Sequence, residues 1–379
     1  MEPSFLGELL PKEFLNIYWN KKPLLVKHAI KNPQEYAAVE DFIEMSKDEY
    51  FETRIVYEKG GEYPWQAKNG PLTDEDFRSD ALWTLICHNL ELLNSDFFEL
   101  KKNVRFIPDW NFDDIMATIS KKGASVGAHV DDYSVFIIQG MGSRKWLLQE
   151  NPNPEYLPNL DIKLLKEFHP DIEWILEPGD MIYIPPNVAH HGISLEDSIS
   201  YSLGFKSIRY KDILDHHITQ VIVNVDEASF HDKAICAQSD SFLLQDYVVE
   251  NIYNDLLKFM DDKVIFKNSL LMYLSRPKNI IENNVDITPE NVHKELAALS
   301  PFKRDVWAKM VSNRLASKQF QVSINSNVFK VSIETYQKLS QYFLKEADET
   351  SKLAKSDLEN IELIHLMALL IQNGVFYFV

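Results

Sequence analysis

Two histidines and one aspartate are spaced as the ligands of a metal centre would be. His129 and Asp131 are two residues apart in a segment with strand character, so both side chains would point to the same face of the strand. About sixty residues later, His190 follows a turn, a short apolar strand and Pro185-Pro186. Two imidazoles and one carboxylate are the facial ligand set of non-haem Fe(II) oxygenases, which leaves open positions on the metal. The spacing therefore predicts an iron site, whereas zinc would favour a closed tetrahedral set or three ligands and a water.

The first segment alone does not decide between a metal ligand and a buried histidine that is hydrogen-bonded to an aspartate. The second segment favours the metal, because the turn after Gly179 and the stop at Pro185 would deliver His190 to the mouth of a barrel. Asn187 stands where glycine would be usual, and asparagine tolerates the left-handed conformation better than most residues. His191 follows directly, and only one of two adjacent strand residues can point inward. The turn spacing favours His190, with His191 as the alternative.

The open metal positions require a co-substrate. If 2-oxoglutarate chelates the iron through its 1-carboxylate and keto oxygen, and O2 takes the last position, the distal carboxylate needs a cation inside the barrel. Arg144 is the candidate, because its planar guanidinium binds a carboxylate through two parallel hydrogen bonds. Lys145 is the alternative, but it should face outward if Arg144 faces inward. Ser120, at the end of the preceding strand, is a candidate for a further hydroxyl donor.

The segments that contain these residues have β character. Short apolar segments separated by glycine and proline turns predict strands at residues 114–120, around His129, at 135–139, 145–148 and 174–176, around Met181 and at 198–205. Such a series suggests a small antiparallel barrel or jelly roll, in which alternate residues face the interior. A barrel of this kind would bring two nearby ligands and a distant third together.

Mixed elements precede the β region. Apolar spacing predicts helices at residues 5–19, 39–45 and 82–93, strands at 24–27 and 54–57, and a hairpin turn at 59–62.

After residue 209 the pattern becomes mainly helical. Helices are predicted at residues 210–223, 241–260 and 269–274, with another that begins at Thr288 as N-cap and Pro289 in its first turn. A hairpin of residues 319–324 and 328–331, helices at 336–344 and 358–372, and a closing strand at 375–379 suggest a winged-helix-like module. The chain as a whole is thus expected to be α+β.

Composition narrows the class of protein. The chain has 379 residues, of which 45% are hydrophobic and 25% are charged, as in globular proteins of two or three domains. No apolar run is long enough to span a membrane, and the first residues show no secretory signal. Two cysteines, Cys87 and Cys236, form neither a disulfide framework nor a zinc pattern, which predicts a cytoplasmic protein.

The net charge of −18 is unevenly distributed. Residues 301–379 hold ten Lys and Arg against eight Asp and Glu, so the first three hundred residues carry about −20. An acidic body does not favour a phosphate-backbone partner and suits a basic one, although it would also serve solubility alone. The nearly neutral tail offers no basic recognition stripe, so direct nucleic-acid binding is not expected.

Several motifs together resemble the JmjC-domain, 2-oxoglutarate- and Fe(II)-dependent ribosomal oxygenases. The chain is most similar to the bacterial members that hydroxylate an arginine of large-subunit ribosomal protein sixteen. The motifs are Phe106-Ile107-Pro108-Asp109-Trp110, His129-Val130-Asp131, Val135-Phe136-Ile137-Ile138-Gln139-Gly140, Glu177-Pro178-Gly179-Asp180, Tyr183-Ile184-Pro185-Pro186, Tyr201-Ser202-Leu203-Gly204-Phe205 and Phe376-Tyr377-Phe378. The resemblance covers about two hundred N-terminal residues well and the remainder loosely.

The resemblance implies a JmjC double-stranded β-helix at residues 1–209, a helical dimerisation region at 210–300 and a winged-helix-like domain at 301–379. It also implies that His129, Asp131 and His190 bind iron, and that Arg144 and Ser120 bind 2-oxoglutarate. The substrate would be a basic ribosomal protein, hydroxylated on an arginine β-carbon by a homodimeric enzyme. His191 and Ser200 depart from the glutamate and asparagine expected at their positions.

Three other interpretations remain open from the sequence. The same chemistry could act on another residue, as in a histidyl hydroxylase or a methyl-lysine demethylase. A cupin-like metalloenzyme without 2-oxoglutarate would share the metal ligands but would not need Arg144. A non-catalytic cupin and winged-helix protein would bind partners only.

Overall fold

The structure is a computed structural model that describes residues 4–33, 36–58, 65–78, 81–93, 96–160, 162–225, 231, 243–279, 288–316, 318–345, 347 and 349–379. Contacts within the chain divide it into two compact units, Met1–Ser207 and Ile208–Val379. The hairpin turn predicted at residues 59–62 and one of the two cysteines, Cys236, lie outside the described residues.

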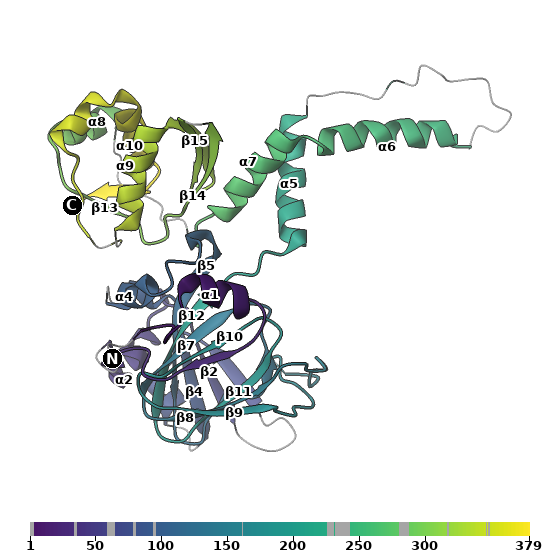
Figure 1. Ribbon diagram of the computed structural model, residues 1–379, viewed down its shortest axis with the longest axis vertical. Coiled ribbons are helices and arrows are strands. Elements are labelled where there is room, and N and C mark those ends of the chain that lie inside the picture. Colours follow the sequence, from purple (N-terminus) through teal and green to yellow (C-terminus); the bar gives the residue numbers. More distant parts are fainter. Residues whose placement is uncertain are drawn as a thin grey trace. The chain divides into compact units, whose positions relative to one another are not determined.

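The first unit is built on an eight-stranded antiparallel sheet with the strand order β1-β10-β7-β12-β5-β4-β2-β3 (Figure 1). Its strands are β1 (Leu24–Val26), β2 (Thr53–Glu58), β3 (Trp65–Asn69), β4 (Leu82–Cys87), β5 (Phe112–Ser120), β7 (Val135–Met141), β10 (Met181–Ile184) and β12 (Ser198–Phe205). A second sheet has the order β6-β11-β8-β9. It contains β6 (His129–Val130), β8 (Arg144–Gln149), β9 (Ile172–Leu176) and β11 (Ala189–Ser194).

From β5 to β12 the chain passes back and forth between the two sheets. Only β8 and β9 are consecutive strands of the same sheet. This alternation is that of a jelly roll, so the mixed α and β architecture with antiparallel sheets predicted from the sequence is confirmed. Each strand thereby presents one face to the space between the sheets.

The large sheet has two apolar faces. On β7, Val135 and Ile137 belong to a cluster with Trp146 and Leu148 of the small sheet, which shows that this face looks toward the second sheet. Phe136, in between, packs instead with the N-terminal segment. Side chains that alternate along a strand can fill both layers in this way.

The N-terminal segment covers the outer face of the large sheet. Its helices are α1 (Pro11–Ile17), α2 (Val39–Met45), α3 (Asp74–Phe77) and α4 (Phe97–Lys102). Phe14 of α1 is fully buried, and its ring lies 4.9 Å from that of Tyr183 and 5.4 Å from that of Phe136. Large aromatic side chains in such contacts contribute much of the apolar burial that fixes the sheet.

The second unit begins with three helices, α5 (Tyr210–Asn224), α6 (Asp246–Met260) and α7 (Lys263–Leu274). The α5 and α7 helices pack together, and the buried His217 on α5 lies 3.2 Å from the hydroxyl of Ser269 on α7. The α6 helix buries none of its side chains. None of the described helices is long and apolar enough to cross a membrane.

The rest of the second unit has its own core. It contains α8 (Pro289–Ala297), α9 (Ile333–Leu344) and α10 (Ile361–Gln372), the sheet β14 (Met310–Ala316), β15 (Gln319–Ile324) and β16 (Asn327–Ser332), and the pair β13 (Phe302–Arg304) and β17 (Phe376–Phe378). The Thr288 hydroxyl accepts a hydrogen bond from the Asn291 N–H, which confirms the predicted N-cap of α8. The predicted hairpin is β15–β16.

One helix prediction is wrong. Residues 82–93 were expected to be helical, but Leu82–Cys87 form β4, which pairs with β2 and β5. A short, mostly apolar run cannot be assigned by periodicity alone, and here the pairing with a strand on each side makes the segment a strand. The helix predicted at residues 5–19 is also shorter, at Pro11–Ile17.

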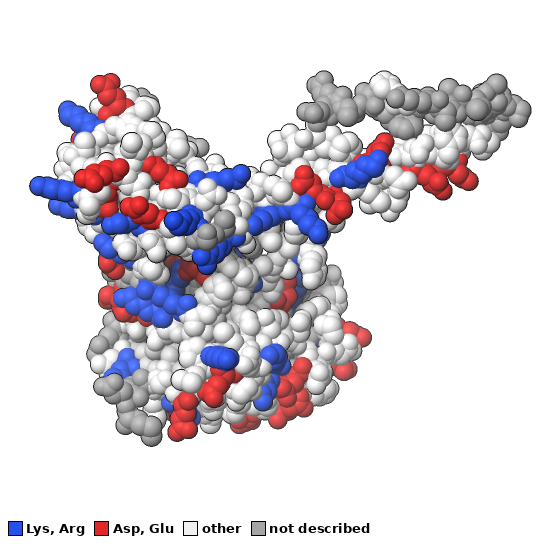
Figure 2. All heavy atoms as spheres, turned by 45° about the horizontal axis from the view of Figure 1, so that its top comes forward, with Lys and Arg blue, Asp and Glu red and all other residues white. Residues whose placement is uncertain are grey.

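Few charged side chains of the described residues are buried, among them those of Arg144 and Asp180. On the face shown in Figure 2, lysines and arginines are interspersed with acidic residues among the described side chains.

Candidate metal centre and co-substrate cavity

His129 and His190 face each other across two neighbouring strands. They are paired in the antiparallel register of β6 and β11, and their ring centroids are 4.2 Å apart. Directly opposed residues of an antiparallel pair lie close enough for their side chains to meet. The pairing explains how a separation of about sixty residues in the sequence becomes one site.

Backbone carbonyls fix both imidazoles in one tautomer. His129 Nδ1 lies 3.0 Å from the Gly127 carbonyl oxygen, and His190 Nδ1 lies 3.1 Å from that of Val188. Because a carbonyl only accepts, each Nδ1–H donates, and in the neutral imidazole the lone pair is then on Nε2. A histidine held in this way presents Nε2 to a metal.

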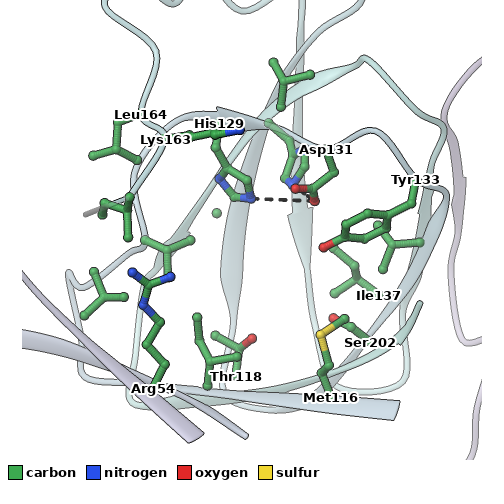
Figure 3. A pocket seen from close by; sticks show the side chains of 18 of the residues that line it. Arg54, Met116, Thr118, His129, Asp131, Tyr133, Ile137, Lys163, Leu164 and Ser202 are labelled. Atoms are coloured by element: carbon green, nitrogen blue, oxygen red, sulfur yellow. Dashed lines mark ion pairs between the residues drawn. The ribbon is translucent and has the colours of Figure 1, made fainter. Parts of the chain in front are cut away.

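The carboxylate of Asp131 completes the cluster. Its Oδ2 lies 3.5 Å from His190 Nε2 and 3.8 Å from His129 Nε2, and a dashed line in Figure 3 marks the contact between the carboxylate and an imidazole. The three candidate ligand atoms all lie within 4.8 Å of one another. Among the residues that the structure describes, these three form the one such cluster of His, Cys, Asp and Glu.

The turn before β11 adopts the conformation expected from the sequence. Asn187 has φ of 65°, in the left-handed region, and its N–H donates to the Asp131 carbonyl oxygen over 2.8 Å. Asparagine is one of the few residues other than glycine that tolerate this conformation. The turn therefore ties the segment of the second histidine to that of the aspartate.

The structure also separates His190 from His191. His190 is 3% exposed and belongs to the cluster, whereas the Nε2 of His191 lies 2.9 Å from the Ser125 hydroxyl, outside the cavity. Burial lowers the pKa of both imidazoles to about 4, and for each the proximity of His129 adds to the effect. Both side chains are thus neutral at physiological pH, the form in which histidine binds metals.

Arg144 is buried inside the barrel at 3% exposure, and Lys145 points away from it. The guanidinium donates hydrogen bonds to the hydroxyls of Ser194 over 3.2 Å and Ser200 over 3.5 Å, and to that of Ser120. Burial lowers the pKa of Arg144 to about 10, so it remains a cation. No carboxylate of the described residues lies within ion-pair distance of it.

Further hydroxyls and an amide hold the surroundings of Arg144 in place. Ser120 also lies 2.9 Å from the Thr84 hydroxyl, and Ser200 donates to Gln139 Oε1 over 2.9 Å. Buried polar groups that satisfy one another form a rigid network. Ser120, which was predicted from the sequence, and Ser200, which departs from the expected asparagine, therefore both contact the guanidinium of Arg144.

One cavity of about 500 Å³ connects the cluster and the arginine. The lining residues are Arg54, Val56, Ile86, His88, Met116, Thr118, Val126, His129, Val130, Asp131, Tyr133, Val135, Ile137, Arg144, Trp146, Ile162, Lys163, Leu164, His190, Gly192 and Ser202. Figure 3 shows His129 and Asp131 on one side of this cavity and the side chains of Arg54 and Met116 on the other. Its volume lies within the range of small-molecule sites.

Several lining residues were not predicted from the sequence. Arg54 comes from β2, far from the other site residues in the chain, and Lys163 comes from the connection between β8 and β9. Tyr133 follows the aspartate by two residues, and burial together with the charge of Asp131 raises its pKa. The alternation of β8 could have identified Trp146, because it must face the same way as Arg144.

One family model matches part of the chain. Residues 99–213 match the model of the JmjC domain. The chain therefore contains a JmjC domain, and the resemblance noted in the sequence is confirmed.

Three curated relatives match about half of the chain. The chain is 31% identical to the probable ribosomal oxygenase of Haemophilus influenzae over 211 residues, 55% of this chain and 52% of that protein. It is 31% identical to the ribosomal protein uL16 3-hydroxylase of Escherichia coli over 203 residues, 53% of this chain and 54% of that protein. A third, the bifunctional lysine-specific demethylase and histidyl-hydroxylase NO66 of Aedes aegypti, is 23% identical over 204 residues, 47% and 30% of the two chains. The matches to the first two span about half the length of those relatives.

A solved structure shows the same fold over nearly the whole chain. The structure of YcfD, a ribosomal oxygenase from Escherichia coli, in complex with cobalt and 2-oxoglutarate superposes with a TM-score of 0.78 at 22% identity. The alignment covers 98% of this chain and 99% of that chain.

Proposed function

We propose that the protein is a 2-oxoglutarate- and Fe(II)-dependent hydroxylase that acts on the β-carbon of an arginine in ribosomal protein uL16, the large-subunit protein sixteen. The observation that carries the proposal is a single cavity that holds two histidines and an aspartate at one place and a buried arginine at another. Many cupin-like enzymes would have such metal ligands without the arginine. The metal ligands and the buried arginine together favour a metal that binds a dicarboxylate.

The three candidate ligands fit a divalent iron ion. His129 and His190 each offer an Nε2 lone pair, and Asp131 offers a carboxylate oxygen between them. Two imidazoles and one carboxylate suit non-haem Fe(II) and leave positions open for a co-substrate and O2. The carbonyl partners of the two Nδ1 atoms would orient the ligands, as outer hydrogen bonds do at known metal sites.

Arg144 fits the distal carboxylate of 2-oxoglutarate. A buried guanidinium is costly unless an anion or several acceptors satisfy it, and the hydrogen-bond acceptors of Arg144 among the described residues are hydroxyls alone. A carboxylate would supply the missing charge, and the Ser120 hydroxyl would then lie beside it. The same arginine disfavours a cupin-like enzyme that does not use 2-oxoglutarate.

The protein's own residues would bind, orient and exclude water. Iron and 2-oxoglutarate, when bound, supply the oxidising power that places an oxygen atom on an unactivated C–H bond. Val135, Ile137 and Trp146 form an apolar wall of the cavity, which limits water around the reacting groups. Holding the target carbon close to the metal is the other contribution expected of the chain.

The substrate assignment rests on the relatives and on charge. One relative is named a probable ribosomal oxygenase, and another is named a ribosomal protein uL16 3-hydroxylase. The acidic first three hundred residues would attract a basic ribosomal protein. A ribosomal substrate also fits the cytoplasmic location expected from the sequence.

A reconstituted reaction tests this function. The protein is incubated with Fe(II), 2-oxoglutarate and a uL16 peptide that contains the target arginine, and both succinate and peptide mass are measured. We expect one oxygen atom to be added to the peptide, and Asp131→Ala to abolish both signals. Full activity of the Asp131→Ala variant would contradict the proposal.

A second candidate is the same chemistry on another residue. The match to a bifunctional lysine-specific demethylase and histidyl-hydroxylase favours this alternative over a non-catalytic binding protein. Fragmentation of the product separates the two: oxygen on histidine or loss of a methyl group from lysine would support the second candidate.

We also propose how the chain is divided into domains and how it assembles. We place the catalytic domain at residues 1–209, a helical dimerisation region at 210–300 and a winged-helix-like domain at 301–379. Exposed apolar side chains support a homodimer, among them Ile222 of α5 at 68% exposure and Leu256 of α6 at 56%. The α8, α9 and α10 helices with the β15–β16 hairpin support the winged helix, which would act as a scaffold rather than bind nucleic acid.

A further inference from the structure

Three cross-strand pairs of β8 and β11 form the wall between the candidate metal ligands and Arg144. Leu148 is paired with His190, Trp146 with Gly192, and Arg144 with Ser194. Alternate residues of a strand share one face, so these pairs follow one another along the inner face of the small sheet. The middle pair therefore stands between the metal end and the arginine end of the cavity.

The indole of Trp146 lies close to both Arg144 and His190. Its ring centroid is 5.8 Å from the Arg144 guanidinium carbon, and its ring is 6.0 Å from that of His190. Trp146 is 6% exposed and lines the cavity together with these two residues. A molecule that bridged the arginine and the metal would have to pass this ring.

Gly192 makes the position of the ring possible. A Cβ atom on Gly192 would lie 2.9 to 3.0 Å from three carbons of the indole six-membered ring, closer than real contacts allow. Its backbone conformation is not left-handed, so the glycine is required by space alone. Because Gly192 has only a hydrogen in place of a side chain, the indole can lie flat against β11 at this position.

We propose that the Trp146 indole, seated on Gly192, determines the length of the dicarboxylate that can bridge Arg144 and the metal. This inference rests on the proposed function, since it assumes a 2-oxo diacid at those two anchors. Both anchors are held by hydrogen bonds, Arg144 by three hydroxyls and the two histidines by carbonyls. Only the middle of the ligand can adapt to a longer chain, and the ring occupies the space into which an extra methylene would bend.

The site should thus select the five-carbon 2-oxoglutarate over its six-carbon homologue, 2-oxoadipate. One methylene in a closely fitted pocket changes affinity by about tenfold or more. Trp146 would be a specificity-determining residue that touches the aliphatic part of the diacid, and Gly192 would position it.

Calorimetric binding to the Mn²⁺-loaded full-length protein tests the inference without turnover. The dissociation constants of both diacids are measured for the wild type and for Trp146→Phe, Trp146→Leu and Gly192→Ala. Trp146→Phe removes no protein hydrogen bond, because the indole nitrogen has no partner among the described residues. Trp174→Leu is the matched control, since Trp174 pairs with Trp146 on the adjacent β9 but does not line the cavity.

In Trp146→Leu we expect the preference for 2-oxoglutarate over 2-oxoadipate to fall by about tenfold. Trp146→Phe should shift it in the same direction by less, and the Trp174→Leu control should keep the wild-type ratio. Gly192→Ala should weaken both diacids by driving the ring into the cavity.

An unchanged ratio in folded Trp146→Phe and Trp146→Leu proteins, with normal thermal unfolding, would overturn the inference and leave the proposed function standing. A wild-type protein that binds neither diacid would contradict the proposed function and this inference with it.

Discussion

Two neighbouring histidines differ in what their ring nitrogens contact. His190 turns its Nδ1 to a carbonyl and its Nε2 to Asp131, while the Nε2 of His191 is beside the Ser125 hydroxyl. Sequence spacing favoured His190, and strand alternation explains why its neighbour cannot share the site. Removing each in turn should therefore have different consequences for metal binding.

Metal-dependent stability tests this difference. An ion that binds only the folded protein adds about 2.7 kcal/mol at a hundred times its dissociation constant, which raises the unfolding temperature by several degrees. We expect Mn²⁺ to raise the melting temperature of the wild type and of His191→Ala, but not of His190→Ala. A metal-dependent rise that persists in His190→Ala and disappears in His191→Ala would show that the ligand is the other histidine.

Glu91 gives the first unit a distinctive pH dependence. Burial is the main cause that raises the pKa of its carboxyl from 4.5 to about 7, and the nearby Asp114 charge adds to it. As the pH rises, the Glu91 carboxyl loses its proton in the unfolded chain before it does so in the folded protein. The free energy of unfolding therefore falls as the pH rises from about 4.5 to about 7. We expect Glu91→Gln to remove that loss, so its stability relative to wild type should grow across this window.

Urea unfolding at a series of pH values measures the effect. Glutamine retains an oxygen that can accept the Ile115 N–H, which Glu91 Oε2 accepts at 3.3 Å. A constant difference between the two proteins at all pH values would mean that the folded-state pKa of Glu91 is ordinary.

Much of the site could be predicted from residue types and spacing, because its candidate metal ligands lie on two short segments with strong turn signals. His129, Asp131 and His190 come together as expected, and Ser120 contacts Arg144. Arg54 and Lys163 were missed because no local pattern marks a side chain that enters a cavity from a distant segment.

The turn at Asn187 brings β11 close to Asp131. Asn187 combines a φ of 65° with a hydrogen bond to the Asp131 carbonyl oxygen. Alanine in this conformation costs about 1–2 kcal/mol, whereas glycine costs little. We therefore expect Asn187→Ala to lower the free energy of unfolding by that amount and to weaken metal binding.

Asn187→Gly is the matched control, because it keeps the backbone N–H and the left-handed conformation. Its stability and metal affinity should stay close to wild type in urea titrations and Mn²⁺ binding. Equal losses in the alanine and glycine variants would show that the side chain, and not the conformation, is what matters.

Strand and helix assignments succeeded where turns bounded the elements and failed where they did not. Residues 112–205 are divided by glycine and proline, and their strands lie close to the predicted ranges. Leu82–Cys87 are apolar except for Thr84 and show no clear alternation, and only pairing with β2 and β5 makes them a strand. That pairing is between segments distant in sequence, so local periodicity could not reveal it.

Exposed apolar side chains on α5 and α6 predict that the whole protein is a homodimer. Ile222 and Leu256 are 68% and 56% exposed, and α6 buries no side chain within the chain. Covering such side chains in a second copy would remove apolar surface from water. Sedimentation should show a dimer for the wild type and a monomer for Ile222→Glu combined with Leu256→Glu, while Mn²⁺ binding remains. A wild-type monomer at all concentrations would contradict the dimer.

The substrate is tested most directly by intact-mass analysis of ribosomal proteins from cells with and without the gene for this protein. We predict that uL16 loses the mass of one oxygen atom when the gene is absent, and that fragmentation places this oxygen on an arginine. Unchanged masses for uL16 and every other ribosomal protein would contradict the ribosomal substrate, and a change mapped to histidine or lysine would transfer the assignment to the second candidate.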